Sequence, residues 1–321
     1  MSAGGGNSRV VALSGGIGGA KLVVGLARVM PAADLLVIAN TGDDFEHLGL
    51  AISPDLDTIM YALAGLDDPQ RGWGRRAETW NFMAALAALG GETWFQLGDG
   101  DLATHVERTR RRAAGEALSA ITADFCRRLG IAVRIVPMSD DPVRTRLRTE
   151  EGWLEFQDYF VRRRCAPTVK ELAYAGAATA RPHPDALEAL TDPRLRAVVI
   201  CPSNPFISIA PILAVPGLRE AIAACAAPVV AVSPIIGGRA VKGPTAKMMA
   251  ELGLEPSAAA VARHYRGLLH GYVLDHADAG EADELGIAVT LAHTLMTTRA
   301  DREALARHVL AAADALAKAH A

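Results

Sequence analysis

Four aspartates in the N-terminal part of the chain have a spacing that suits a site for a cation and a phosphate. Asp43 and Asp44 stand in the segment NTGDD, and Asp55 and Asp57 stand in the segment SPDLDT. We expect the second pair in a loop ahead of a helix over residues 58–66, where carboxylates two residues apart can face one cation. Phosphoryl transfer needs such a site, because a cation neutralises the transferring oxygens and a carboxylate orients or deprotonates the attacking hydroxyl. Taken singly, each aspartate is better explained by a helix cap or a turn.

A glycine-rich segment precedes these aspartates and is typical of a phosphate-binding loop. It lies between a strand predicted over residues 10–13 and a helix predicted over residues 21–30. Its glycines are Gly15, Gly16, Gly18 and Gly19. Glycines let the backbone approach an anion, and the first turn of a helix offers unpaired N–H groups. The spacing matches neither GxGxxG with its acidic partner nor GK[ST], so a simple strand-to-helix turn is the alternative.

A second acidic glycine loop spans residues 96–105. We interpret it as a substrate-contacting loop with Gln96, Asp99 and His105 as its candidates. His105 would serve as a phosphate or proton partner. A turn followed by a helix cap explains the same spacing equally well.

Two later loops place polar groups at predicted helix starts. Ser203 and Asn204 lie between a predicted strand and a helix, which suits a nucleotide phosphate or base, and a simple cap is the alternative. Residues 242–247 combine lysines with a helix N-terminus and would suit a second phosphate.

The composition excludes several classes of protein. The 321 residues carry a net charge of −3 and are 50% hydrophobic, so the chain can bury a large core as one enlarged domain or two. No basic excess indicates nucleic-acid binding, and we interpret Arg108, Arg110, Arg111 and Arg112 as a solvated helix face. We find no membrane span and no signal peptide, and therefore expect a cytoplasmic protein. The four cysteines lack CxxC spacing, so a bound metal should have oxygen ligands, which suits Mg²⁺.

Seven apolar runs alternate with helical stretches, and this alternation predicts an α/β fold of Rossmann-like type. We expect a mostly parallel sheet with helices on both faces. In such a sheet ligands bind beyond the carboxyl ends of the strands, so the polar loops should converge on one site. The predicted strands are residues 10–13, 35–39, 133–136, 197–201, 229–232, 272–274 and 288–291.

Two segments depart from the alternation of strands and helices. The pattern predicts a helical insertion over residues 67–130 and a small hairpin subdomain over residues 144–174. We therefore predict a single domain over residues 9–321, with a smaller inserted region at about 67–180. Residues 1–8 are predicted to be disordered.

Together these blocks resemble the 2-phospho-L-lactate transferase family of coenzyme F-420 biosynthesis. The resemblance runs in order along nearly the whole chain, which makes it more specific than any one loop. The blocks are residues 14–21, 40–44, 53–58, 71–74, 97–99, 103–105, 137–141, 202–205, 232–236 and 295–297.

The resemblance implies a Rossmann-like core, usually a homodimer, and a Mg²⁺-dependent transfer. Family members join the deazaflavin precursor Fo to the phospho-acid part of a guanosine-diphospho-linked donor. The acid is phospholactate, phosphoenolpyruvate or phosphoglycerate. The primary ribityl hydroxyl of Fo attacks the phosphorus that bears the acid, and GMP leaves.

The resemblance also implies roles for single residues. Asp43 and Asp57 become the first candidates as metal ligands and catalytic residues, and Asp57 matches a position that also contacts Fo. Asp44 and Asp55 are the reserves. The glycine loop and the Ser203–Asn204 loop would hold the guanosine phosphates, with Lys21 as a countercharge.

Two positions depart from the family pattern. Gly100 stands where many relatives carry an arginine, so a phosphate contact there would need another cation, with Arg75, Arg76 or Lys242 as candidates. Gln96 stands where some relatives have a lysine near the Fo ring.

Two other classes remain as alternatives. The first is a regulatory nucleotide-sugar-binding protein of the gluconeogenesis-factor type, which shares the glycine-rich start. The second is an NAD-dependent dehydrogenase, which the imperfect GxGxxG and the missing acidic residue after residues 35–39 disfavour.

Overall fold

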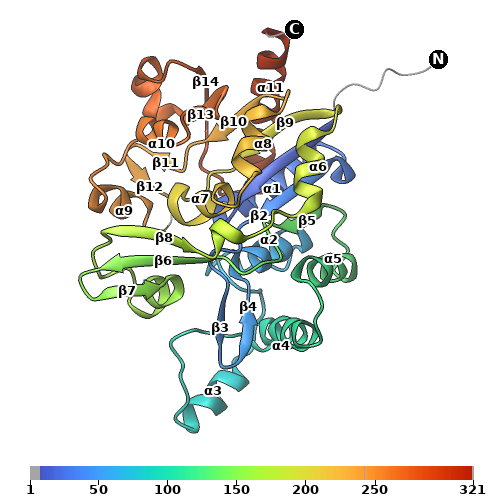
Figure 1. Ribbon diagram of the computed structural model, residues 1–321, viewed down its shortest axis with the longest axis vertical. Helices are drawn as coiled ribbons and strands as arrows, with labels where there is room; N and C mark the ends of the chain where they lie inside the picture. The colour runs from blue at the N-terminus through green and yellow to red at the C-terminus, as the bar shows by residue number, and fades with distance from the viewer. Residues whose placement is uncertain (1–7, 242, 320–321) are drawn as a thin grey trace, which may run out of the picture.

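A seven-stranded sheet forms the centre of the molecule, and all its neighbouring strands are parallel (Figure 1). The computed structural model describes residues 8–241 and 243–319. The strand order is β14-β13-β10-β9-β1-β2-β5, so the predicted Rossmann-like α/β fold is confirmed. The strands are β1 (Arg9–Ser14), β2 (Leu35–Ala39), β5 (Arg134–Pro137), β9 (Leu195–Ile200), β10 (Val229–Val232), β13 (Gly271–Asp275) and β14 (Ala288–Ala292).

Helices cover both faces of the sheet, which explains why its strands could be recognised as apolar runs. Successive side chains of β1 enter two different cores: Val10 and Ala12 pack on one side, Val11 and Leu13 on the other. The first core is closed by α1 (Gly16–Val29), α2 (Pro54–Ala64), α5 (Leu118–Arg128) and α11 (Arg299–Ala319). The second is closed by α6 (Pro184–Thr191), α7 (Ala210–Leu213), α8 (Leu218–Ala224), α9 (Thr245–Glu251) and α10 (Ala258–His264).

The strand order reverses at β1. From β1 the chain builds the sheet outward through β2 and β5, and then returns to add β9 on the other side of β1. The loops that follow β1 and β9 therefore leave the same edge of the sheet side by side, which is where open α/β sheets bind ligands.

The smaller elements lie beside this edge of the sheet. The predicted hairpin is part of a three-stranded antiparallel sheet of β6 (Arg144–Thr149), β7 (Gly152–Glu155) and β8 (Glu171–Ala175). The predicted helical segment contains α3 (Asn81–Ala88) and α4 (Asp99–Ala113), with α3 at the foot of Figure 1. Within the predicted inserted region, α5 and β5 return to the central layers. Short hairpins complete the fold: β3 (Phe45–His47) with β4 (Leu50–Ile52), and β11 (Ile235–Ile236) with β12 (Arg239–Ala240).

Two further predictions concern the disorder of residues 1–8 and the absence of a membrane span. The disorder predicted for residues 1–8 lies outside the described residues except for Ser8, whose N–H donates to the carbonyl of Arg194 at 3.1 Å. No single helix in the described part of the chain is long and apolar enough to cross a membrane. One pair of helices joined by a bend, Pro205–Leu213 with Leu218–Ala224, is long and apolar enough when the two are taken together.

Candidate active site

A cavity of about 480 Å³ opens at the carboxyl edge of the sheet, and the polar loops do converge on it. The loops after β1, β2, β9, β10 and β14 all contribute to its wall. Eleven of the predicted site residues line it: Gly15, Gly16, Gly18, Lys21, Asp43, Asp55, Asp57, Gln96, His105, Ser203 and Asn204. Gly19 and Asp99 are not part of the wall.

The glycine loop and the loop after β9 are joined directly. Ser203 Oγ accepts a hydrogen bond from the Gly15 N–H at 3.2 Å and donates to the Gly15 carbonyl at 2.8 Å. A Cβ added at Gly18 would lie less than 3.0 Å from the Pro202 carbonyl oxygen, and one at Gly19 would collide with Ser203 Oγ. The glycines at 18 and 19 are therefore needed for the close contact of α1 with the β9 loop.

The second aspartate pair does not lie in a loop, so that prediction is wrong. Helix α2 begins at Pro54, and Asp55 and Asp57 both stand in its first turn. Residues two apart on a helix point in different directions, because each residue turns the chain by about 100°. Proline at the first helical position and acidic residues in the first turn are helix-start signals that could have shown this.

Asp55 links three segments of the wall. Its Oδ1 accepts from the Gly16 N–H at 2.6 Å, and its Oδ2 accepts from Asn40 Nδ2 at 2.8 Å. The same Asn40 nitrogen lies 3.3 Å from Asp43 Oδ1 and 3.2 Å from the Ile207 carbonyl. Asn40 therefore holds Asp43 and Asp55 side by side, a role that the sequence pattern did not reveal.

Asp57 forms an ion pair with a buried arginine from a distant part of the sequence. The Arg108 guanidinium donates to both oxygens of Asp57, with Nη1 at 3.0 Å from Oδ2 and Nη2 in a close contact with Oδ1. The Arg108 side chain is 1% exposed and the Asp57 side chain is 6% exposed. The interpretation of Arg108 as part of a solvated face is therefore wrong. Asp101, His105 and Arg108 recur at helical spacing on one face of α4, a signal that could have separated Arg108 from its neighbours.

His105 lies between two carboxylates in the same part of the wall. Its Nδ1 is 3.6 Å from Asp57 Oδ2, and its Nε2 is 3.2 Å from Asp101 Oδ2 without a well-aligned hydrogen bond. Asp101 Oδ1 accepts from the Tyr61 hydroxyl at 2.6 Å. Among the described residues, Asp57, Asp101 and His105 form a group whose possible metal-binding atoms lie within 4.8 Å of one another.

Asp99 caps the start of α3. Its exposed carboxylate accepts from Thr79 Oγ1 and from the N–H groups of Asn81 and Phe82 at the start of α3. The Thr79 and backbone hydrogen bonds lower the pKa of Asp99 to about 2. Glu78 caps α4 in return, through the N–H groups of Gly100 and Asp101 at 2.6 and 2.8 Å.

One of the candidate cations stands beside Gly100. Arg75 Nη1 donates to the Gly100 carbonyl at 3.1 Å, and its Cζ would lie 3.5 Å from a Cβ at that position. Arg76 instead pairs with Asp67 at 3.7 Å. The third candidate, Lys242, lies outside the described residues.

The remaining predicted residues line the wall while making contacts of their own. Lys21 Nζ donates to the Met296 carbonyl at 2.7 Å. Asn204 accepts from the Phe206 and Ile207 N–H groups as the cap of a short helical turn and donates to Thr245 Oγ1 at 3.0 Å. The Gln96 amide donates to the Thr93 carbonyl at 2.6 Å.

Three carboxylates, those of Asp43, Asp44 and Asp55, are buried in the same part of the site, and the Arg144 guanidinium acts on two of them. Burial raises the pKa of Asp43 well above its usual value, and the charges of Asp55 and Asp44 raise it further. Burial likewise raises the pKa of Asp44 to about 7 and that of Asp55 to about 6. Asp44 Oδ1 is buried without a hydrogen-bond partner. This part of the site favours a bound proton or a bound cation.

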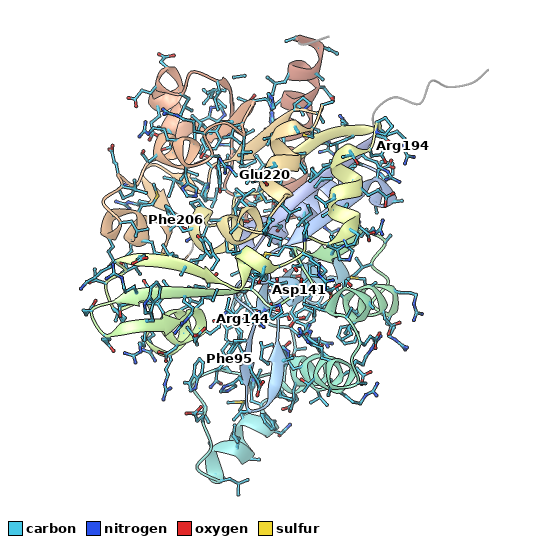
Figure 2. All side chains as sticks on the ribbon, in the orientation of Figure 1. Phe95, Asp141, Arg144, Arg194, Phe206 and Glu220 are labelled. Carbon is cyan, nitrogen blue, oxygen red and sulfur yellow. The ribbon has the colours of Figure 1, made fainter. Side chains whose placement is uncertain are left out.

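Aromatic side chains from segments outside the central sheet also line the cavity. Trp73, Phe95, Phe156 and Phe160 line it. Phe156 and Phe160 stack on each other with ring centres 5.3 Å apart. Phe95 lies between α3 and the small sheet in Figure 2. Its ring and that of Phe45 pack edge to face, with ring centres 4.8 Å apart.

Comparison with known proteins decides the family. The model of the family described as 2-phospho-L-lactate transferase CofD matches residues 10–313. The chain belongs to this family. It is therefore a transferase of the coenzyme F-420 biosynthesis family, as the sequence resemblance implied.

Curated relatives share close to half of the residues of this transferase. A protein named phosphoenolpyruvate transferase from Streptomyces griseus subsp. griseus is 45% identical over 315 residues, which cover 95% of this chain and 98% of that protein. A protein of the same name from Thermobifida fusca is 43% identical over 84% of this chain and 87% of its own. A crystal structure of a UPF0052 family member from Bacillus halodurans has the same fold, with a TM-score of 0.65 at 15% identity, covering 95% of this chain and 99% of that one.

Proposed function

We propose that this transferase moves the phosphoenolpyruvyl group from a guanosine-diphospho-linked donor to the deazaflavin Fo and releases GMP. The observation that carries the proposal is the layout of the cavity. Its wall combines the glycine loop and the polar loops of the central sheet, which we call the polar end, with aromatic rings from segments outside that sheet, which we call the aromatic end. Buried aspartates lie in the same wall. The name shared by the curated relatives supports phosphoenolpyruvate as the acid.

The polar end suits the donor. The glycine loop, Ser203 and Asn204 present backbone and side-chain groups at the strand-order reversal, where open α/β sheets bind nucleotides. We assign the guanosine diphosphate to this end, with Lys21 beside it as a cation. Thr245, at the start of α9, lines the same end.

The aromatic end suits the acceptor. A planar deazaflavin ring can stack on faces such as those of Trp73, Phe95 and Phe160, since aromatic groups favour offset stacking and edge contacts. Gln96 lies in the same wall and can hydrogen-bond a polar ring edge. This arrangement would direct the ribityl chain of Fo toward the aspartates.

The aspartates fit a divalent cation. Asp43 and Asp57 line the cavity, and burial together with the charges of Asp55 and Asp44 raises the pKa of Asp43 well above its usual value, which supports a cation beside it. We propose that Asp43 and Asp57 hold Mg²⁺, whose hard oxygen preference matches them. When bound, the ion neutralises charge on the transferring phosphoryl oxygens. Asp55 stays the reserve candidate; both its oxygens accept hydrogen bonds from Gly16 and Asn40, as both oxygens of Asp57 accept from Arg108.

The transfer step exchanges one phosphorus–oxygen bond for another. The ribityl hydroxyl oxygen forms a bond to the phosphorus bearing the acid, and the bond from that phosphorus to the bridging oxygen breaks. The bridging oxygen and its electron pair leave with GMP. Asp57 or Asp43 orients the hydroxyl and accepts its proton.

Incubation of the purified protein with Fo, Mg²⁺ and the guanylylated acid tests this function. We expect a product whose mass equals Fo plus the phosphoenolpyruvyl group, together with GMP. Absence of both products while Fo fails to bind would favour the regulatory nucleotide-binding class instead.

Mg²⁺ should stabilise the protein more at about pH 7.5 than at about pH 5. In the unfolded chain both aspartates have a pKa of 3.8, whereas in the folded protein the pKa is about 6 for Asp55 and about 7 for Asp44. Between these pH values the folded state holds protons that the unfolded chain has lost. The stability from these two groups therefore falls as pH rises through that window. A cation beside these carboxylates is bound more strongly once they carry their negative charge, so Mg²⁺ stabilises the protein more at the pH where those protons have left.

The measurement is the difference in melting temperature with and without Mg²⁺ at each pH. His47 and His264, whose pKa values burial lowers, affect both samples alike and cancel in the difference. A Mg²⁺-dependent shift that is equal at both pH values would contradict a cation site among these carboxylates.

A further inference from the structure

The group of Asp57, Asp101 and His105 has the spacing of a metal site, yet a guanidinium already lies in it. Arg108 Nη1 is 3.0 Å from Asp57 Oδ2 and 3.3 Å from His105 Nδ1. Its Nη2 contacts the other oxygen of Asp57. The chain thus supplies one cation of its own to this wall, on the side of Asp57 that faces α4.

Arg108 is held on several sides, so its position is fixed. Nη1 also lies 3.4 Å from the Ala51 carbonyl at the edge of β4, and the ring of Phe125 in α5 lies 6.0 Å from its Cζ. A guanidinium has a planar fork that matches a carboxylate through two parallel hydrogen bonds. A fork fixed in this way also fixes the plane of the carboxylate that it contacts.

We propose that Arg108 is a positioning residue for the transfer reaction, whose guanidinium fixes the orientation in which Asp57 faces the cation and the acceptor hydroxyl. This inference rests on the proposed function of Asp57. Partners that orient a metal ligand commonly matter almost as much as the ligand, and their loss costs about 10–100-fold in metal affinity or activity. The arginine acts through Asp57 and needs no contact with the substrates.

A purely structural role is the competing explanation, since Arg108 also ties α4 to β4. The two explanations differ in their coupling to Asp57. A structural tie would lower stability and leave turnover per folded molecule intact. A positioning role lowers turnover through Asp57, so the loss should disappear once Asp57 is itself removed.

The Arg108→Lys variant keeps the charge and removes the fork, and Arg110→Lys is the matched control. Arg110 stands on the same helix, and its side chain is 68% exposed and pairs with Glu107. For Arg108→Lys we expect kcat to fall about 10–100-fold, with the KM for the donor unchanged. Titration calorimetry of Mg²⁺ into the substrate-free protein should show an affinity about tenfold weaker. Arg110→Lys should match the parent protein in each measurement.

The Asp57→Asn variant and the double variant Asp57→Asn with Arg108→Lys complete a double-mutant cycle, which measures the coupling between the two residues. We expect the double variant to be no slower than Asp57→Asn alone. Three results would overturn the proposal: a folded Arg108→Lys variant within twofold of the parent in both kcat and Mg²⁺ affinity, multiplicative losses in the double variant, or reduced stability with unchanged turnover per folded molecule. If Asp57→Asn transfers at the parent rate, the proposed function of Asp57 fails instead.

Discussion

Replacing Asp57 by asparagine should abolish Mg²⁺-dependent transfer. The amide keeps the shape of the carboxylate and loses its charge, so it can neither balance a divalent cation nor accept the proton of the acceptor hydroxyl. We expect a loss of turnover of at least about a thousandfold, since removal of a single catalytic aspartate can cost about 10⁴-fold. The measurement is the rate of GMP release under saturating Fo and donor.

The structure adds a cost in stability to the same substitution. Asp57→Asn leaves the buried Arg108 charge without its counter-ion, and breaking a buried pair costs about 3–5 kcal/mol. Turnover must therefore be expressed per folded molecule, with circular dichroism and the melting temperature as controls. A folded variant that retains the parent rate would contradict the assignment of Asp57 as a metal ligand and catalytic residue.

Replacing Gly18 by alanine should disrupt the junction between the glycine loop and the loop after β9. The new Cβ would lie less than 3.0 Å from the Pro202 carbonyl, and a backbone atom cannot move away as a flexible side chain can. Overpacking of this kind typically costs about 1–3 kcal/mol. Because Gly18 and Pro202 both line the cavity, the donor should also bind more weakly.

Urea unfolding and the KM for the donor measure these two effects. Gly280→Ala is the matched control, since a Cβ there meets no atom within 4 Å. We expect Gly280→Ala to leave the donor KM unchanged and Gly18→Ala to raise it. A Gly18→Ala variant with the stability and donor KM of the parent would show that this close contact is not required.

The central sheet could be predicted from sequence because most of its strands are buried on both faces, although the edge strand β14 is partly exposed. Such strands appear as continuous apolar runs, and all seven predicted runs are strands of the sheet. The polar loops that follow them converge because carboxyl ends of parallel strands share one edge. The glycine loop could be placed for the same reason, as the connection from β1 to α1.

The partners of the aspartates could not be predicted, because they depend on contacts between distant segments. Arg108 reaches Asp57 from 51 residues further along the chain, and α4 must pack on β4 for that to happen. Asn40 joins Asp43 to Asp55 only after α2 is set against the loop following β2. Single-residue patterns assign a cap or a turn to such positions and contain no information on which carboxylates meet.

Asp99 shows the opposite case, in which the simpler alternative, a turn and a helix cap, describes the structure. Its carboxylate caps α3 while Glu78 caps α4, so the acidic glycine loop contains the turn and cap that its spacing also predicts. His105 in the same loop lines the cavity. The difference arises because Asp99 begins α4 and points to α3, whereas His105 lies about 1.7 turns later on the inner face of the helix.

The central claim is tested most directly by mass analysis of the products formed from Fo, Mg²⁺ and each guanylylated acid in separate reactions. The acids are phosphoenolpyruvate, phospholactate and 3-phosphoglycerate. The proposed function predicts one phosphoenolpyruvyl–Fo formed for each GMP released, and slower conversion of the other two donors. Full binding of Fo with no adduct from any of the three donors would contradict it.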